Sequence, residues 1–217
     1  MKQKSAVIFD MDGVISDTQN IHAQTESDIF KLYGVELSAE EITRKYAGFK
    51  DYDFFETVLK QYHLEDFIED AIARKKAKLY EEVKGLKEID GATALIKKLS
   101  KAGFPLAVAS GSPKFYIEKV LNYLKVKDYF QVVLSTEEVK LGKPAPDAFL
   151  RAAELLGVIP ELCTVIEDGR NGMIAAKVAG MKCVGLVPDK SLVDEYRVDK
   201  LVESMRELGV GDFVIGD

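Results

Sequence analysis

Five short apolar runs, spaced along the chain, limit the folds that it can adopt. The first run, residues 6–9, reads AVIF and is followed at once by Asp10. Short runs of this kind are typical of strands that are buried on both faces of a sheet. Similar runs occupy residues 105–109, 131–134, 163–166 and 183–187. The sequence therefore predicts a sheet of five strands at the centre of the molecule.

Helical patterns precede each of the later runs. Apolar residues recur at helical spacing in 92–101, 115–124, 148–156 and 173–179, and three of these segments are closely followed by a glycine. Glycine often ends a helix, because it adopts the left-handed conformation without strain. Alternating strands and helices predict an α/β fold with a Rossmann-like parallel sheet. Functional side chains of such sheets lie beyond the carboxyl ends of the strands.

The segment 15–87 has a different pattern, because helical stretches follow one another without a clear strand. These stretches are 18–33, 39–46, 52–62 and 64–83. We expect an all-helical domain, 15–87, inserted after the first strand of a core domain formed by 1–14 and 88–217. The aromatic side chains of Tyr52, Phe54 and Phe55 are expected in the core of this insert.

Composition excludes several classes of function. The formal net charge of −6 lacks the positive field that nucleic-acid binding needs, so no nucleic-acid partner is expected. No apolar run reaches the roughly 20 residues that span a bilayer, so no membrane partner is expected either. Cys163 and Cys183 lie in apolar runs without zinc-site spacing, which favours buried thiols and a cytoplasmic location. A monomer or a weak homodimer is expected.

Two carboxylates follow the first predicted strand. The segment 9–14 reads FDMDGV, which places Asp10 and Asp12 two residues apart before a glycine. Asp10 is suited to attack phosphorus as a nucleophile, and Asp12 to transfer a proton to or from the reacting oxygens. A calcium loop or a polar turn is the alternative for this short motif. An EF-hand does not fit, because the later oxygen ligands of its loop are missing.

Three further strand ends or loops carry polar residues. Ser110 and Gly111 follow the second strand, where a hydroxyl and backbone N–H groups could hold phosphate oxygens, although Ser-Gly at this point is often only a turn. Lys143 precedes two prolines of a stiff loop, and its alternative is an ordinary exposed lysine. Glu167 and Asp168 end the fourth strand.

Adjacent acids at the end of an apolar strand are costly to bury unless a cation lies near them. Mg²⁺ binds one or two carboxylates together with phosphate and water. We therefore expect Mg²⁺ as the cofactor. Asp10 and Asp168 would supply carboxylates, Asp12 its backbone carbonyl, and Glu167 a direct or water-mediated contact.

Taken together, these motifs make the chain resemble the haloacid dehalogenase superfamily over essentially its full length. The segment GVISDT at 13–18, the segment KPAPD at 143–147 and the acidic pair are similar to the β-phosphoglucomutase-like subgroup, and the helical insert resembles that family's C1 cap. The resemblance implies that Asp10 is the nucleophile and Asp12 the general acid/base. It implies that Ser110 and Lys143 bind the phosphoryl group, and that Glu167 and Asp168 organise magnesium.

The resemblance also suggests residues of the cap that contact the substrate. His22 matches a substrate-handling histidine, although a solvent-facing position on an amphipathic helix is the alternative. Lys75, or its neighbour Lys76, matches a cap lysine. The loop 46–51 resembles a substrate-specificity loop, but the arginine that binds a second phosphate is missing. Lys50 could replace it, without the bidentate geometry of a guanidinium.

These observations predict a Mg²⁺-dependent phosphatase that hydrolyses a small phosphorylated metabolite, with sugar phosphates as the leading class, through an aspartyl-phosphate. The alternative is a phosphosugar mutase of the β-phosphoglucomutase type. Two other functions fit the sequence less well. A dehalogenase does not need Asp12, and a non-catalytic binding module does not need all four groups of motifs.

Overall fold

A six-stranded parallel sheet forms the centre of the molecule, with the strand order β3-β2-β1-β4-β5-β6. The structure is a computed structural model, which describes residues 5–46, 49–81, 85–187 and 198–215. The strands are β1 (Ala6–Phe9), β2 (Leu106–Ser110), β3 (Val132–Ser135), β4 (Cys163–Glu167), β5 (Lys182–Leu186) and β6 (Lys200–Val202).

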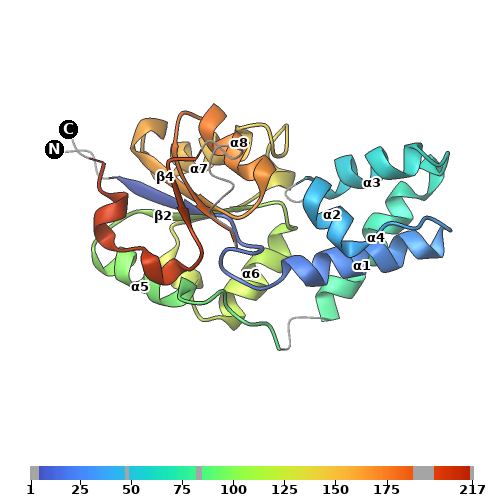
Figure 1. Cartoon of the computed structure of the whole chain (residues 1–217), viewed down its shortest axis with the longest axis horizontal. Coiled ribbons are helices and arrows are strands. Elements are labelled where there is room, and N and C mark those ends of the chain that lie inside the picture. The colour runs from blue at the N-terminus through green and yellow to red at the C-terminus, as the bar shows by residue number, and fades with distance from the viewer. Residues whose placement is uncertain (1–4, 47–48, 82–84, 188–197, 216–217) are drawn as a thin grey trace.

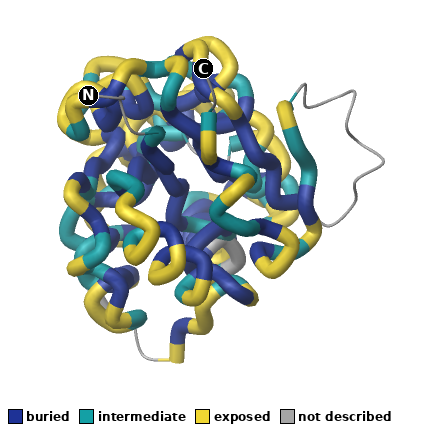
Figure 2. Tube along the Cα trace, turned by 90° about the vertical axis from the view of Figure 1, so that its left-hand side faces the viewer, coloured by how far each residue is buried: buried dark blue, intermediate teal, exposed yellow. Residues whose placement is uncertain are grey.

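Helices cover both faces of the sheet (Figure 1). Successive residues of β1 point to opposite faces, so Val7 and Phe9 pack with one set of helices and Ala6 and Ile8 with the other. The first set is α5 (Ala92–Lys101) and α6 (Lys114–Tyr123), and the second is α7 (Asp147–Leu156) and α8 (Arg170–Val178). Figure 2 shows the resulting buried interior beneath exposed loops.

Four helices lie together at one side of the sheet (Figure 1). They are α1 (Gln19–Leu32), α2 (Ala39–Tyr46), α3 (Asp51–Lys60) and α4 (Ile68–Glu81). Their apolar residues form a core of their own, centred on Phe30, Phe54 and Phe55. A separate core is what an independent domain requires, and on that ground we propose the division into a core, 1–14 and 88–217, and a cap, 15–87.

The two chain segments that connect cap and core run side by side. Ile89 N donates to the carbonyl of Ile15, and Asp17 N donates to the carbonyl of Lys87, both at 3.0 Å. The cap is therefore attached to the core through a narrow pair of backbone segments.

Parallel pairing brings three strand ends together. Phe9 of β1 lies opposite Val108 of β2 and Ile166 of β4. The residues that follow these strands therefore meet at one rim of the sheet, as the strand–helix alternation predicts.

The structure confirms the five predicted strands and the helical pattern of the insert, and it corrects three details. A sixth strand, β6, was not predicted. The helix predicted over 64–83 consists of a short 3₁₀ turn (Glu65–Phe67) followed by α4, and its predicted end lies outside the described residues. Tyr52 is 48% exposed and does not belong to the cap core, because it lies on the outer face of α3.

Within the described residues, none of the helices combines the length and the apolar character needed to cross a bilayer.

Candidate active site

Lys143 lies between two carboxylates at the rim of the sheet. Its Nζ is 2.6 Å from Asp10 Oδ1 and 2.6 Å from Glu167 Oε1, and its side chain is fully buried. Burial opposes the charge on Lys143, but the two carboxylates raise the pKa of the amine above its ordinary value. The lysine therefore stays protonated and neutralises charge next to Asp10.

The acids at this rim outnumber the single lysine. Burial raises the pKa of Asp10 to about 8, against the opposing pull of Lys143, and the charges of Glu167 and Asp12 add to the rise. Burial also raises the pKa of Asp168 well above its ordinary value, together with the charges of Glu167 and Asp10. Such a surplus of carboxylates is the environment in which a divalent cation is favourable.

Two glycines let these acids approach the backbone closely. Gly13 has a left-handed φ of 81°, and a Cβ atom there would lie 2.1 Å from Asp168 Oδ2. A Cβ atom on Gly172 of α8 would lie 1.7 Å from Glu167 Oε1. Any larger residue at either position would displace a carboxylate from the rim.

The donor set fits Mg²⁺ in its chemistry, since hard carboxylate oxygens are the ligands that this ion prefers. Among the described residues, no three acidic, histidine or cysteine side chains converge closely enough to enclose a metal by themselves. Mg²⁺ keeps several water or phosphate ligands, so a site with as few as two protein carboxylates, such as Asp10 and Asp168, would fit its chemistry.

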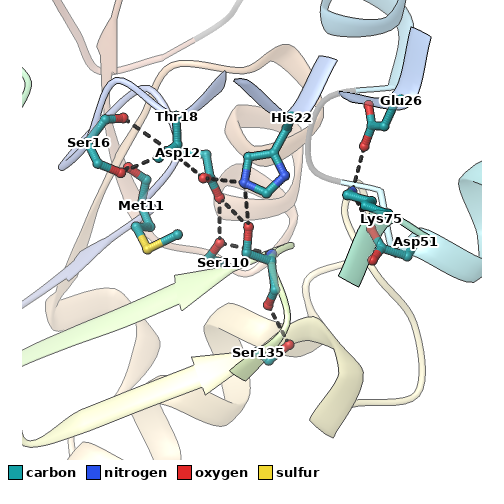
Figure 3. Close-up of polar contacts among 11 residues, drawn as sticks. Met11, Asp12, Ser16, Thr18, His22, Glu26, Asp51, Lys75, Ser110 and Ser135 are labelled. Atoms are coloured by element: carbon teal, nitrogen blue, oxygen red, sulfur yellow. Dashed lines mark hydrogen bonds and ion pairs between the residues drawn. The ribbon is translucent and has the colours of Figure 1, made fainter. Parts of the chain in front are cut away.

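Asp12 is held by hydrogen bonds from four side chains (Figure 3). Its Oδ1 accepts from Thr18 Oγ1 at 2.5 Å and lies 3.1 Å from His22 Nε2. Its Oδ2 accepts from Ser112 Oγ at 2.8 Å and from Ser110 Oγ at 2.9 Å. Burial tends to raise the pKa of Asp12, but His22 and the hydroxyl donors together hold it well below its usual range.

The loop after β2 is fixed by its own hydroxyl groups. Ser110 is fully buried, and its Oγ accepts from Ser112 N at 3.0 Å. Ser135, at the end of β3, donates from Oγ to the carbonyl of Ser112 at 2.7 Å. Ser110 therefore positions Asp12 and the loop, while Gly111 and Ser112 line the pocket itself.

A pocket lies between this rim and the cap, and it encloses about 60 Å³. From the core, the pocket is lined by Asp10, Asp12, Gly111, Ser112, Glu167, Asp168 and Gly169. From the cap, it is lined by His22, Ala23, Glu26, Ile42, Thr43, Tyr46, Phe49, Asp51, Phe54 and Lys75.

The cap residues expected to meet the substrate lie in different places. His22 is 8% exposed and contacts Asp12 and Ser112, so the solvent-facing alternative is wrong. Lys75 lines the pocket, but its amine is already bound by two carboxylates. Its neighbour Lys76 lies outside the pocket lining, 3.1 Å from Glu137 of the core.

Lys50 does not line the pocket. Its stem packs on Gly142, and its Nζ donates to the backbone carbonyls of Val139 and Lys140, at 2.9 Å for Lys140. In this arrangement its amine is unavailable to a substrate, and it connects the cap to the loop that leads into Lys143. Of the specificity loop 46–51, residues 47–48 lie outside the described residues.

Comparison with known proteins identifies the family. The family described as Haloacid dehalogenase-like hydrolase matches residues 7–186. The chain belongs to this family. Hexitol phosphatase B of Escherichia coli is 30% identical over 221 residues, which cover 98% of each protein. A phosphorylated carbohydrates phosphatase of Thermotoga maritima is 30% identical over 180 residues, or 82% of each.

A crystal structure of β-phosphoglucomutase from Clostridium difficile has the same fold. Its TM-score is 0.84, at 23% identity, over 96% of this chain and 95% of that one. The predicted haloacid dehalogenase fold and superfamily are therefore confirmed, and the named phosphatases among the relatives support a phosphoric monoester hydrolase.

Sequence reasoning did not single out four of the residues that build this haloacid dehalogenase-like site. Thr18 and Ser112 hold Asp12. Thr18 ends the segment 13–18 that the resemblance quoted, and Ser112 directly follows Ser110 and Gly111, so both positions offered a signal. Glu26 and Asp51 hold Lys75. Asp51 ends the loop 46–51 that resembles a substrate-specificity loop, whereas Glu26 stands in no recognisable motif, and only the packing of the cap helices brings the two acids together.

Proposed function

We propose that this chain is a phosphatase that transfers the phosphoryl group of a small phosphorylated metabolite to Asp10 and then to water. The single observation that carries the proposal is the position of Asp10. Its carboxylate lies at the end of β1, 2.6 Å from a buried lysine, in a pocket that the cap covers. The named activities of the two phosphatase relatives favour a sugar or sugar-alcohol phosphate as the substrate.

In the proposed reaction, an oxygen of Asp10 attacks phosphorus as the bond to the leaving oxygen breaks. Lys143 would neutralise charge beside the transferring group, and backbone N–H groups near Gly111, which lines the pocket, would hold its oxygens. Mg²⁺, held by Asp10 and Asp168 with Glu167 nearby, would supply further positive charge when bound.

Asp12 would protonate the leaving oxygen and later take a proton from the attacking water. Its hydrogen bonds from Thr18, Ser110, Ser112 and His22 favour the ionised form, which is the form that acts as a base. To act as an acid, the carboxyl has to exchange some of these bonds for the leaving oxygen. Three of its four partners are hydroxyl groups, which can rotate away at little cost.

The first test is a panel of phosphorylated metabolites with wild type and Asp10→Asn, with and without Mg²⁺. We expect phosphate release by wild type and a loss on the order of 10⁶-fold in Asp10→Asn, the scale seen when a covalent nucleophile is removed. Asp128→Asn, an exposed acid far from the site, is the matched control. Full activity in Asp10→Asn would exclude Asp10 as the nucleophile.

The same panel separates the proposal from a phosphosugar mutase. Incubation with a hexose phosphate and a bisphosphate primer yields free phosphate from a phosphatase and an isomeric hexose phosphate from a mutase. A rapidly acid-quenched sample should carry a phosphoryl group on the peptide that contains Asp10.

A further inference from the structure

The cap contributes its own ionic cluster to the pocket. We call Glu26, Asp51 and Lys75 the cap cluster. They come from α1, α3 and α4, and Lys75 Nζ lies 2.5 Å from Glu26 Oε1 and 2.5 Å from Asp51 Oδ1 (Figure 3). Each of the three residues is at most 7% exposed, and all three line the pocket that also contains Asp10.

The charge of the cap cluster is unsuited to a second phosphate. Its one lysine already donates to the carboxylates of Glu26 and Asp51, so its charge is shared between two acids of the cap cluster itself. Burial raises the pKa of Glu26 in spite of the opposing charges of Lys75 and His22. A phosphate dianion placed here would lie against carboxylate oxygens in a poorly solvated site, where like charges repel strongly.

One oxygen of the cap cluster lacks a hydrogen-bond donor. Asp51 Oδ2 is buried and accepts no hydrogen bond from the described residues, whereas Asp51 Oδ1 accepts from Lys75. A buried acceptor without a donor is unfavourable, and a ligand that donates a hydrogen bond removes the penalty. Ile42 and Phe54 line the same pocket and offer apolar surface beside it. A hydroxyl group on a carbon chain fits both features.

We propose that the cap cluster is the specificity site of the enzyme, at which Asp51 Oδ2 accepts a hydrogen bond from a hydroxyl group of a polyhydroxylated monophosphate. This inference rests on the proposed phosphatase function, and it narrows the substrate to esters whose far end is neutral and rich in hydroxyl groups. The cap cluster also rejects bisphosphates, since their second phosphate would meet Glu26 and Asp51. The rejection removes the bisphosphate primer on which a mutase depends.

A purely structural role is the competing explanation. Lys75 connects three helices of the cap, so the cap cluster could serve only to hold the cap together. A structural role predicts that a change at Asp51 alters the turnover of every substrate in parallel. A specificity role predicts that substrates which reach the cap cluster respond differently from a substrate too small to reach it.

The test compares Asp51→Asn with wild type on three probes: acetyl phosphate, sorbitol phosphate and a hexose bisphosphate. Asn keeps the shape of the side chain and one oxygen for Lys75, but it removes the charged acceptor. We expect the ratio of kcat/KM for sorbitol phosphate to that for acetyl phosphate to fall about tenfold or more. The ratio of kcat/KM for the hexose bisphosphate to that for acetyl phosphate should rise. Asp53→Asn, an exposed acid two residues along α3, should keep the wild-type ratios.

Each outcome has a distinct meaning. Parallel changes for all three probes, or a wild type that prefers the bisphosphate, would overturn the specificity site while leaving the phosphatase intact. A wild type that does not hydrolyse acetyl phosphate or any other probe would instead remove the proposed function. Glu26→Gln provides a second variant if Asp51→Asn does not fold. It removes a negative charge but keeps Asp51 Oδ2, so the kcat/KM ratio of the bisphosphate to acetyl phosphate should rise while that of sorbitol phosphate stays unchanged, and an unchanged bisphosphate ratio would overturn the specificity site.

Discussion

Two buried lysines, Lys143 in the core and Lys75 in the cap, stand in nearly identical local settings. Lys143 lies 2.6 Å from each of two carboxylates, and Lys75 lies 2.5 Å from each of two others. The surroundings differ. Lys143 interacts with a third acid, Asp168, whereas Lys75 lies among the cap helices and shares its pocket with the apolar side chains of Ile42 and Phe54.

This difference shows that a buried lysine between two acids does not define a function by itself. In the core, carboxylates outnumber the lysine, which suits a metal cation that acts together with Lys143 to neutralise the charge of a phosphoryl group. In the cap cluster, only two acids face the lysine, and Asp51 Oδ2, which accepts no hydrogen bond from the described residues, calls for a hydrogen-bond donor instead. We therefore propose that the lysine between two acids in the core faces the phosphorylated end of the substrate. The corresponding arrangement in the cap faces its neutral end.

Replacing each lysine by methionine is the most severe test of this comparison. Lys143→Met should lower kcat/KM for acetyl phosphate by about 10³-fold, because it removes fixed positive charge from the transferring group. Lys75→Met should lower it far less. Both variants leave buried acids unpaired and should lose about 3–5 kcal/mol of unfolding free energy, so thermal melting has to accompany the kinetics. Equal losses of kcat/KM in the two variants would show that Lys143 and Lys75 do not have different roles.

Removal of the metal gives the next largest effect. Chelation should abolish turnover, and Mg²⁺ at 100 times its Kd should stabilise the wild type by about 2.7 kcal/mol. The stabilisation is measured by thermal unfolding, independently of activity. Asp168→Asn should lose this shift, whereas Asp51→Asn in the cap should keep it. A Mg²⁺-induced shift that survives Asp168→Asn would show that the ion binds elsewhere.

The sequence could predict the core end of the pocket and two residues of its cap end, His22 and Lys75, but not the two acids that hold Lys75. Asp10, Lys143 and Asp168 follow from local rules, since strand ends of a parallel sheet meet at one rim. Glu26, Asp51 and Lys75 stand on three separate helices, and nothing in helical periodicity reveals how those helices rotate against one another. Lys50 was misjudged for the same reason, because its contact with the loop before Lys143 exists only after cap and core have packed together.

Sequence patterns also failed where an element is short. The strand β6 has three residues and begins with a lysine, so it lacks the apolar run that marked the others. The buried cysteines show the opposite case. Cys163 and Cys183 stand in apolar runs, and both are fully buried as predicted. Burial together with the charge of Glu161 raises the pKa of Cys163 to about 11, so that thiol is a poor nucleophile.

The contacts that hold the cap against the core can be tested separately. Lys50 reaches two carbonyls of the core from a partly buried position, whereas Lys76 forms a half-exposed ion pair with Glu137. Lys50→Ala should lower the free energy of unfolding by about 1 kcal/mol, and Lys76→Ala by about 0.5 kcal/mol or less. Urea denaturation measures both. A larger effect at Lys76 would mean that the ion pair, and not the carbonyl contacts, holds the cap.

The smallest expected effect is a pH dependence of the free energy of unfolding, which should have opposite signs for Glu26 in the cap and Asp12 in the core. Burial raises the pKa of Glu26, so its contribution to stability is full below the unfolded value of about 4.3 and declines as pH rises through the folded value. Glu26→Gln removes this contribution. The free energy of unfolding of wild type minus that of Glu26→Gln should therefore decrease as pH rises above about 4.3.

Asp12 in the core should show the opposite sign. Its pKa is held low in the folded state, so its contribution is present above the unfolded value of about 3.9 and is lost as pH falls. The difference between wild type and Asp12→Asn should therefore shrink on acidification. Urea denaturation across this range, without Mg²⁺, gives both differences. If both shrink on acidification, Glu26 is stabilised as a carboxylate by Lys75, and the cap cluster has more positive charge available than the specificity site allows.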